Sequence, residues 1–409
     1  MKGNILIAQS GGPTAVINSS CCGIIQQALK HPGQIGAVYG AVNGILGVLN
    51  EDMIDLKKER EETIELLRHT PSSALGSCRR KLTGNELERV MDVMKAHYIR
   101  YCLFIGGNDT MDTASKVDTL AKRQGYAMQV IGVPKTVDND LVGTDHCPGY
   151  PSAARWLAIA VRDAGLDTQA IYTTDTVKII ETMGRNSGWL AAATALARDR
   201  ACTPPHLIYL PERPFDRAKF LRDVERVYRK LGYAVIAVCE GLKDKKGQAI
   251  SESRAKTDID SFGHAQSGGV ADILCRLITD QLGIKARFDK PGTIQRVSMV
   301  CASEVDLEES YLVGTAAMEM ALEGKSGYMV TLKRPKGKKY RGATSMIELE
   351  RVANVERLMP DEFVSEDGND VTAEFLEWLK PLIRPGLPKY AHLKKVPVKK
   401  KLDVFYANR

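Results

Sequence analysis

The sequence predicts an α/β protein built from two doubly wound lobes with parallel-type sheets. Short apolar runs alternate with amphipathic helical patterns over most of the 409 residues, and loops rich in glycine or charge follow several of those runs. A chain of this length can also bury more than one core. Strand–helix alternation implies parallel strands with helices on both faces of each sheet. Ligands of such sheets bind beyond the carboxyl ends of the strands, so the loops there are the first candidates for a site.

The first third of the chain supplies the clearest alternation. Apolar β-rich runs predict strands, and amphipathic runs between them predict helices. The strands are expected at residues 4–9, 34–38, 103–107 and 130–134, and the helices at 15–30 and 110–124.

The same alternation continues through the rest of the chain. We expect strands at 177–183, 207–210 and 234–238, and helices at 188–198, 216–230, 268–282, 346–357 and 371–382. The turn chemistry of residues 146–151 places a lobe boundary near residue 150. The two lobes are therefore predicted to be Rossmann-like, with the active site in the cleft between them.

Composition limits the classes of protein that fit. Hydrophobic content of 44% and charged content of 26% are ordinary for a globular protein. The net charge of +7 includes a lysine run near the end, which is most often a solvated segment when no nucleic-acid motif accompanies it. A basic excess also suits an enzyme that handles polyanionic substrates. We therefore expect no nucleic-acid partner.

Cysteine usage and the apolar runs indicate the compartment. Nine dispersed cysteines without a Cys-x-x-Cys pair predict reduced thiols and no zinc site. The apolar run at residues 189–197 is too short to span a bilayer, and no signal peptide fits the first residues. We expect a cytoplasmic protein that does not bind membranes.

Two loops carry the most chemical information. Residues 106–110 read Gly-Gly-Asn-Asp-Thr, and residues 134–140 read Pro-Lys-Thr-Val-Asp-Asn-Asp. In extended backbone Asp138 and Asp140 face the same side, and two carboxylates in one pocket need a cation such as Lys135, an arginine or magnesium. Phosphoryl transfer requires such a base, phosphate-binding groups and metal. Taken singly, Lys135 is as easily a surface lysine and Asp138 a capping carboxylate.

Other strand-end loops add candidates. Glycines such as Gly11 and Gly12 let the backbone approach an anion near a helix N-terminus, although a lone Gly-Gly is equally a tight turn. Arg185, in Met183-Gly184-Arg185, can hold a phosphate bidentately, and Glu240 can bind sugar hydroxyls or start a turn. Arginine is more often an exposed surface charge, which applies to the further candidates Arg79, Arg287 and Arg296.

Assembled in order, these motifs resemble the phosphofructokinase family over residues 4–335. Family enzymes phosphorylate the 1-hydroxyl of fructose 6-phosphate with ATP or pyrophosphate. The resemblance implies that Asp138 takes the hydroxyl proton, with Thr136 and Asp140 beside it. It also implies two further groups: donor-binding residues Gly11, Gly12, Arg79 and Gly107, and sugar-phosphate-binding residues Met183, Gly184, Arg185, Glu240, Arg287 and Arg296. Residues 1–150, completed by 295–345, would form the donor lobe, and residues 151–294, with 346–409, the sugar-phosphate lobe.

Two positions predict the phosphoryl donor. ATP-dependent members usually carry glycine where this chain has Asp109 and Lys135, whereas pyrophosphate-dependent members are similar to this chain. A carboxylate at position 109 occupies space that the α-phosphate of a nucleotide needs and adds repulsive charge. Lys135 can stabilise the transferring phosphoryl group and the leaving phosphate. We therefore predict pyrophosphate and fructose 6-phosphate as substrates.

The chain also departs from the family pattern. Asn108 replaces an aspartate that supports magnesium, so an Mg²⁺ ion would depend more on the diphosphate and Asp140. Thr176 and Thr293 replace an arginine and a histidine near the sugar phosphate in many bacterial ATP-dependent members. These changes leave sedoheptulose 7-phosphate open as an additional acceptor.

Three alternatives remain at this point. An ATP-dependent phosphofructokinase differs mainly at Asp109 and Lys135. An NAD or lipid kinase resembles this chain only around residues 106–110. A regulatory sugar-phosphate-binding subunit would be expected to lack the base, whereas Asp138 is present. The resemblance further implies a homodimer or homotetramer.

Overall fold

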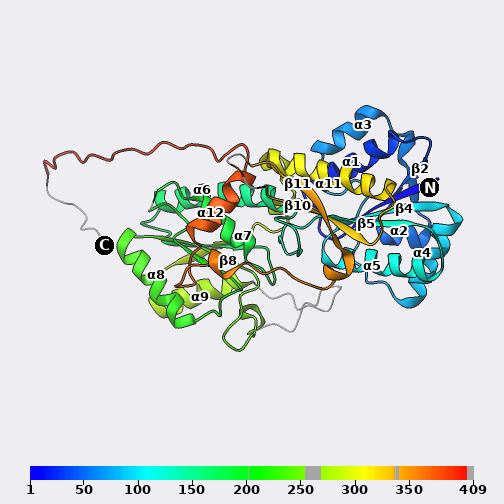
Figure 1. The fold of residues 1–409 in the computed structure, drawn as a ribbon. Coiled ribbons are helices and arrows are strands. Elements are labelled where there is room, and N and C mark those ends of the chain that lie inside the picture. The colour runs from blue at the N-terminus through cyan, green and yellow to red at the C-terminus, as the bar shows by residue number, and fades with distance from the viewer. Residues whose placement is uncertain (201, 254–268, 336, 338–339, 403–409) are drawn as a thin grey trace.

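The computed structural model describes residues 1–409 except 201, 254–268, 336, 338–339 and 403–409. Its strands form two sheets, each at the centre of its own lobe (Figure 1). The first sheet has seven strands in the order β11-β10-β5-β4-β1-β2-β3, and the second has four in the order β7-β8-β6-β9. This arrangement confirms the predicted α/β class with parallel-rich sheets.

The first sheet is parallel through its centre and antiparallel at both edges. Its strands are β1 (Gly3–Gln9), β2 (Ile35–Ala41), β3 (Met53–Asp55), β4 (Ile99–Gly106), β5 (Gln129–Pro134), β10 (Tyr328–Lys333) and β11 (Ala343–Glu348). The helices of this lobe are α1 (Ile17–Leu29), α2 (Ile45–Asn50), α3 (Glu61–Leu66), α4 (Gly84–Ala96), α5 (Asn108–Arg123) and α11 (Glu304–Leu322).

Alternating side chains give this sheet two buried faces. Ile5 and Ile7 of β1 pack in one core with α1 and α11, whereas Leu6 and Ala8 pack in a second core with α4 and α5. Because helices cover both faces, the central strands consist almost entirely of apolar residues. The strand ends and the loops after them are the parts of this sheet left to carry polar groups.

The second sheet is parallel throughout and smaller. Its strands are β6 (Val177–Thr182), β7 (Leu207–Tyr209), β8 (Ala234–Cys239) and β9 (Ala286–Asp289). Its helices are α6 (Tyr150–Ala170), α7 (Trp189–Ala193), α8 (Arg217–Leu231), α9 (Val270–Leu282), α10 (Ile294–Val297) and α12 (Ala373–Leu379). Side chains of α6, α7 and α12 share one core with this sheet, and side chains of α8 and α9 share the other.

The predicted helix at residues 346–357 is wrong. Residues 343–348 form β11, which pairs antiparallel with β10, and a short 3-10 helix (Leu349–Arg351) follows it. The charged residues there suggested a helix. Pairing with β10, a tertiary contact, outweighs that local preference and makes the segment a strand. After residue 351 the chain leaves the first lobe and crosses to α12 of the second (Figure 1).

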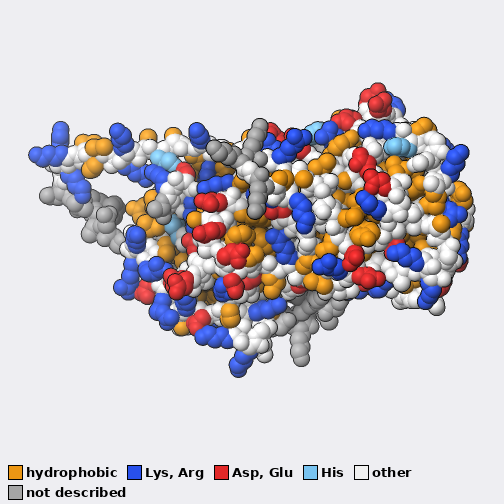
Figure 2. All heavy atoms as spheres, viewed as in Figure 1, with side chains coloured by type: hydrophobic (Ala, Val, Ile, Leu, Met, Phe, Trp, Pro, Cys, Tyr) orange, Lys and Arg blue, Asp and Glu red, His pale blue; other side chains and the backbone are white. Residues whose placement is uncertain are grey.

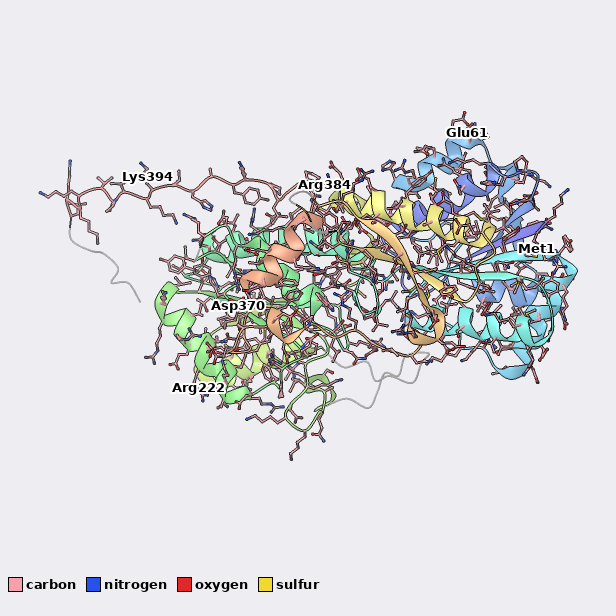
Figure 3. The ribbon with its side chains drawn as sticks, in the orientation of Figure 1. Met1, Glu61, Arg222, Asp370, Arg384 and Lys394 are labelled. Atoms are coloured by element: carbon pink, nitrogen blue, oxygen red, sulfur yellow. The ribbon has the colours of Figure 1, made fainter. Side chains whose placement is uncertain are left out.

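The end of the chain runs along the second lobe and then away from it. The hydroxyl group of Tyr390 donates a hydrogen bond to Asp163 of α6 at 2.7 Å. The lysine-rich run lies beyond this contact. Figure 3 shows the chain extending past Lys394, and Figure 2 shows the basic side chains of this segment outside the body of the protein. Among the described residues, no helix is both long enough and apolar enough to cross a membrane.

Candidate active site

Most of the predicted site residues lie just after β1, β4 and β5 of the first lobe or after β6 and β8 of the second; the exceptions are Arg79 before α4, Arg287 on β9 and Arg296 in α10. The loops of the two lobes are in direct contact, because the Ser187 hydroxyl donates a hydrogen bond to the Asp138 carbonyl oxygen at 3.0 Å. The backbone of Ala15 likewise donates to the Arg296 carbonyl oxygen at 2.9 Å. Residues separated widely in sequence therefore meet where the two lobes join.

Lys135 is buried beneath the glycine loop. Its side-chain nitrogen donates hydrogen bonds to the carbonyl oxygens of Ser10 at 2.8 Å and Gly12 at 2.7 Å. Burial, with Arg296 and Arg79 nearby, lowers the pKa of Lys135 to about 7 despite the opposing effect of the aspartates. A buried lysine with a lowered pKa beside two arginines indicates an anion-binding site.

The glycine loop itself packs against two arginines. A Cβ atom added to Gly12 would lie 2.8 Å from Nη1 of Arg296 and 3.7 Å from Nη2 of Arg79. Gly11 has a φ angle of +77°, and a Cβ atom there would lie 3.2 Å from the Lys135 side-chain nitrogen. The backbone conformation at Gly11 favours glycine, and the loop comes close to three cationic side chains.

Asp138 is a buried carboxylate with a raised pKa. Burial, followed by the charges of Asp140 and Glu240, raises the pKa of Asp138 to about 7, while Arg185 and Lys135 act in the opposite direction. Its Oδ1 atom is buried and has no hydrogen-bond partner among the described residues. A carboxylate with a pKa near neutrality and an unused oxygen has the properties of a general base.

Asp140 lies on the same loop and is also a buried carboxylate with a raised pKa. Burial raises the pKa of Asp140, opposed by a hydrogen bond from Thr136. Its Oδ1 atom also lacks a hydrogen-bond partner within the described part of the chain. Two buried and unpaired carboxylate oxygens so close in sequence are a suitable environment for a cation.

The metal would need ligands beyond the protein. No group of three or more His, Cys, Asp or Glu residues in the described structure is placed to hold a metal ion by itself. Asn108, the predicted metal residue, uses its amide differently: it donates to the Val355 carbonyl at 2.7 Å and accepts from the Asn354 amide at 2.7 Å. The site therefore fits a cation that is shared between Asp140 and a polyanionic ligand.

The second lobe contributes the loop after β6. Gly184 has a φ angle of +120°, and its amide donates to Oε1 of Glu240 at 3.3 Å. The Met183 amide donates to the buried side chain of Gln295 at 3.0 Å. Burial raises the pKa of Glu240. The structure therefore brings Met183, Gly184 and Glu240 together, and the charges of Arg185 and Glu240 act on Asp138.

Two predicted site residues have exposed side chains that form ion pairs. Asp109, in the first turn of α5, is 75% exposed and forms a 3.5 Å ion pair with Lys81. Arg287 is 55% exposed on β9 and pairs with Asp175 at 3.0 Å. Gly107 precedes α5 and caps it, since its carbonyl oxygen accepts hydrogen bonds from the amides of Thr110 and Met111. In this chain, Asp109 and Arg287 thus face solvent.

Sequence reasoning missed other residues that shape the site. Glu212 accepts hydrogen bonds from the amides of Gly188 at 2.8 Å and Met359 at 3.1 Å. Arg357 donates from its backbone to the Asp140 carbonyl at 2.7 Å. No local motif marks either residue, and Arg357 fell within the segment that was expected to be a helix.

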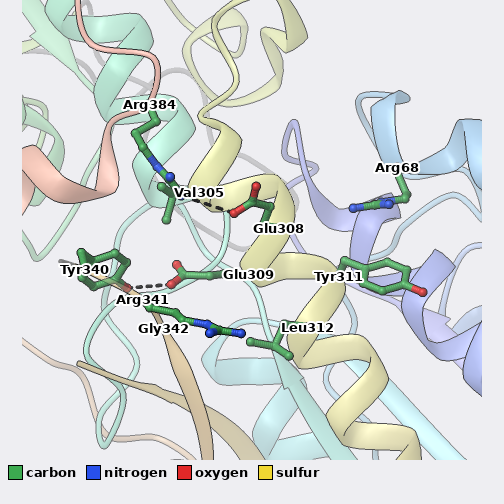
Figure 4. A pocket seen from close by; sticks show the side chains of 10 residues that line it. All are labelled: Arg68, Val305, Glu308, Glu309, Tyr311, Leu312, Tyr340, Arg341, Gly342 and Arg384. Atoms are coloured by element: carbon green, nitrogen blue, oxygen red, sulfur yellow. Dashed lines mark hydrogen bonds and ion pairs between the residues drawn. The ribbon is translucent and has the colours of Figure 1, made fainter. Parts of the chain in front are cut away.

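A cavity of about 690 Å³ lies elsewhere, along α11 (Figure 4). Tyr340 on one side of it donates a hydrogen bond to Glu309 at 2.7 Å, and Arg384 pairs with Glu308 at 3.3 Å. None of the predicted site residues lines this cavity.

Comparison with known proteins places this geometry in a family. Residues 4–289 match the family described as phosphofructokinase. A protein of Methylococcus capsulatus named pyrophosphate--fructose 6-phosphate 1-phosphotransferase is 43% identical, with 99% of each chain covered. The crystal structure of a pyrophosphate-dependent phosphofructokinase from Marinobacter aquaeolei is 42% identical, covers 98% of this chain and 99% of its own, and superposes with a TM-score of 0.85. A second pyrophosphate-dependent phosphofructokinase structure, from Nitrosospira multiformis, is 41% identical with the same TM-score and covers 99% of this chain and 100% of its own.

Proposed function

We propose, from the premise that this chain belongs to the phosphofructokinase family, that it is a pyrophosphate-dependent enzyme. It transfers a phosphoryl group from pyrophosphate to the 1-hydroxyl of D-fructose 6-phosphate and releases phosphate. The observation that carries the proposal is the buried Lys135 nitrogen beneath Gly12, with the unpaired carboxylate of Asp138 on the same loop. Relatives that carry this activity in their names are 40–43% identical over nearly the whole chain.

The reaction follows from the roles of these groups. Asp138 accepts the proton of the 1-hydroxyl as the sugar oxygen bonds to phosphorus, and the bridging bond of pyrophosphate breaks to release phosphate. Lys135 stabilises the charge that develops on the transferring group and on the leaving phosphate. Because pyrophosphate is hardly more energetic as a phosphoryl donor than the sugar phosphate ester that forms, the reaction also runs readily in reverse.

The donor and acceptor occupy different loops. Gly11, Gly12, Arg79 and Gly107 bind pyrophosphate, and the loop of Met183, Gly184 and Arg185 with Glu240 and Arg296 binds the sugar phosphate. This division is supported by the placement of Arg79 and Arg296 against Gly12, at the boundary between the two groups. Arg287, which faces solvent on β9, would reach a sugar phosphate only if a second copy of the chain brings its site to that edge.

The cation required for phosphoryl transfer is proposed to be Mg²⁺. Asp140 and Asp138 have buried, unpartnered oxygens that fit a hard cation, and the diphosphate supplies further oxygens. When bound, Mg²⁺ neutralises charge on the phosphates. Asn108 would have to release Val355 and Asn354 to become a ligand, so we assign the ion to Asp140 rather than to Asn108.

The assembly and compartment are also proposals. Large apolar side chains near β9 and α10 are exposed, including Ile294 at 55% and Val300 at 94%, which favours a homo-oligomer that covers them. All nine cysteines are free thiols, as expected in the reducing cytoplasm. Sedimentation would measure the assembly, and a monomer at assay concentration would contradict it.

The test of the function is a paired assay. Purified protein with fructose 6-phosphate and Mg²⁺ is given pyrophosphate or ATP in parallel, and fructose 1,6-bisphosphate is measured. Turnover with pyrophosphate supports the proposal. Turnover with ATP alone would favour the ATP-dependent alternative, and binding of sugar phosphate without turnover would favour a regulatory subunit.

A further inference from the structure

We propose that Arg357 is a positioning residue for the carboxylates of the catalytic loop, an inference that rests on the proposed function. Arg357 lies in a segment that we call the strap, residues 352–359, which follows the 3-10 helix after β11. The strap lies after residues 4–289, in a part of the chain that still aligns with the Methylococcus capsulatus relative.

The strap crosses the site from the first lobe to the second. It begins against Asn108, whose amide nitrogen donates to the carbonyl oxygens of Val352 at 3.3 Å and Val355 at 2.7 Å. It ends at Met359, whose backbone amide donates to Glu212 at 3.1 Å. One short segment thus contacts the start of α5 at one end and the second lobe at the other.

The middle of the strap lies against the catalytic loop. Glu356 forms a β-bridge with Leu141, and its side chain accepts a hydrogen bond from Asn186 of the second lobe at 3.0 Å. The backbone amide of Arg357 donates to the Asp140 carbonyl oxygen at 2.7 Å. The strap therefore holds the backbone beside the two aspartates at the point where both lobes meet.

The Arg357 side chain extends this contact along the loop. Its Nη1 donates to the carbonyl oxygens of Thr144 at 2.9 Å and Asp145 at 2.8 Å. Its Cζ atom lies 4.6 Å from the ring centroid of Trp189, which is fully buried in the second lobe. One residue therefore binds the loop by backbone at Asp140 and by side chain at Thr144 and Asp145, while stacking on the opposite lobe.

Other hydrogen bonds also hold the loop. Asn139, which adopts a left-handed φ of 54°, accepts a hydrogen bond from the Cys147 amide at 2.8 Å. The adjacent His146 bonds to Asp145 at 2.9 Å and Glu309 at 2.7 Å. Arg357 is thus one of several groups that hold the loop, so its loss should loosen the loop without removing it. Since Asp138 must meet a sugar hydroxyl at hydrogen-bond distance, a small displacement lowers the rate.

The experiment compares Arg357→Gln and Arg357→Lys with the wild-type enzyme. Arg351→Gln is the matched control, because Arg351 lies just before the strap, is exposed, and has a side chain that forms no hydrogen bond or ion pair with the described residues. We expect Arg357→Gln to lower kcat about 10- to 100-fold while KM for each substrate changes less than about 3-fold. Arg357→Lys should give an intermediate kcat, because lysine keeps the charge but not the planar fork. Arg351→Gln should match wild type.

Two further readouts separate positioning from folding. Tm is measured for each variant, and hydrogen exchange is followed for the amides of residues 136–147, which requires no turnover. Faster exchange in Arg357→Gln than in Arg351→Gln, with kcat reduced at temperatures well below Tm, supports the inference. The inference would be overturned if Arg357→Gln had the same exchange rates and kcat as Arg351→Gln. It would also be overturned if kcat fell only at temperatures where the lowered Tm leaves Arg357→Gln partly unfolded.

If Arg357→Gln does not fold, Arg357→Lys decides, because full activity and unchanged exchange in that variant would contradict the inference. Failure of the proposed function is distinguishable, since it would appear as wild-type protein inactive with pyrophosphate while the exchange comparison still applies.

Discussion

The side-chain nitrogen of Lys135 donates a hydrogen bond to the carbonyl oxygen of Gly12 at 2.7 Å. This contact joins the loop after β5 to the loop after β1, and it places a buried lysine at the backbone that we propose approaches the phosphoryl donor. The proposed role of Lys135 in binding pyrophosphate therefore rests on where its amine lies, and not only on its positive charge.

The first prediction concerns the protonation of Lys135. Burial and the neighbouring arginines lower its pKa to about 7, so one pH unit above that value the free enzyme holds it mostly neutral. A bound polyanion favours the ammonium form, so pyrophosphate binding should take up protons. Calorimetry in two buffers of different ionisation enthalpy measures this uptake, with Lys135→Met as the control. Equal proton uptake by both proteins would exclude Lys135 as its source.

The second prediction concerns donor choice. Lys135→Gly should lower kcat with pyrophosphate by about 10² to 10³-fold, because a transition-state contact to a charged group is lost. Asp109→Gly should raise activity with ATP from a very low level, since it removes bulk and charge at the start of α5. Asp109→Asn keeps the size of the side chain and separates the two effects. An unchanged ratio of kcat/KM for the two donors in all variants would remove the basis for the assignment.

The third prediction concerns the general base. Asp138→Asn should lower kcat by about 10² to 10⁴-fold with fructose 6-phosphate binding retained. Burial and Asp140 raise the pKa of Asp138 to about 7, and the base must be deprotonated, so wild-type kcat/KM should rise as pH passes through that value. The apparent value belongs to the Asp138–Asp140 pair. A variant with near-normal kcat would show that another group takes the proton.

Much of this site could be predicted because its groups are close in sequence. Lys135, Asp138 and Asp140 share one loop after a predicted strand. The position of that strand and the alternation of side chains in extended backbone were enough to group them. The state of Asn108 could not be predicted, since its partners at 352–355 lie over 240 residues away. The same applies to β11, whose pairing with β10 overrode a helical pattern. Contacts that close over long separations leave no local periodic signal.

The fourth prediction concerns stability against pH. His146 is fully buried; burial alone would lower its pKa, but hydrogen bonds to Asp145 and Glu309 raise it to about 9 from 6.5. The charged imidazole therefore contributes stability that is complete below pH 6.5 and is lost as pH rises toward 9. Chemical denaturation across this range should show the decline, and His146→Gln should flatten it. An equal decline in both proteins would contradict this role of His146.

The central claim is that this chain uses pyrophosphate to phosphorylate fructose 6-phosphate. The most direct test is the initial rate of fructose 1,6-bisphosphate formation by the purified protein with Mg²⁺, with pyrophosphate and ATP supplied in parallel. The buried Lys135 and the aspartate at position 109 predict rapid turnover with pyrophosphate, phosphate as the second product, and little or no turnover with ATP. Turnover with ATP alone would contradict the account.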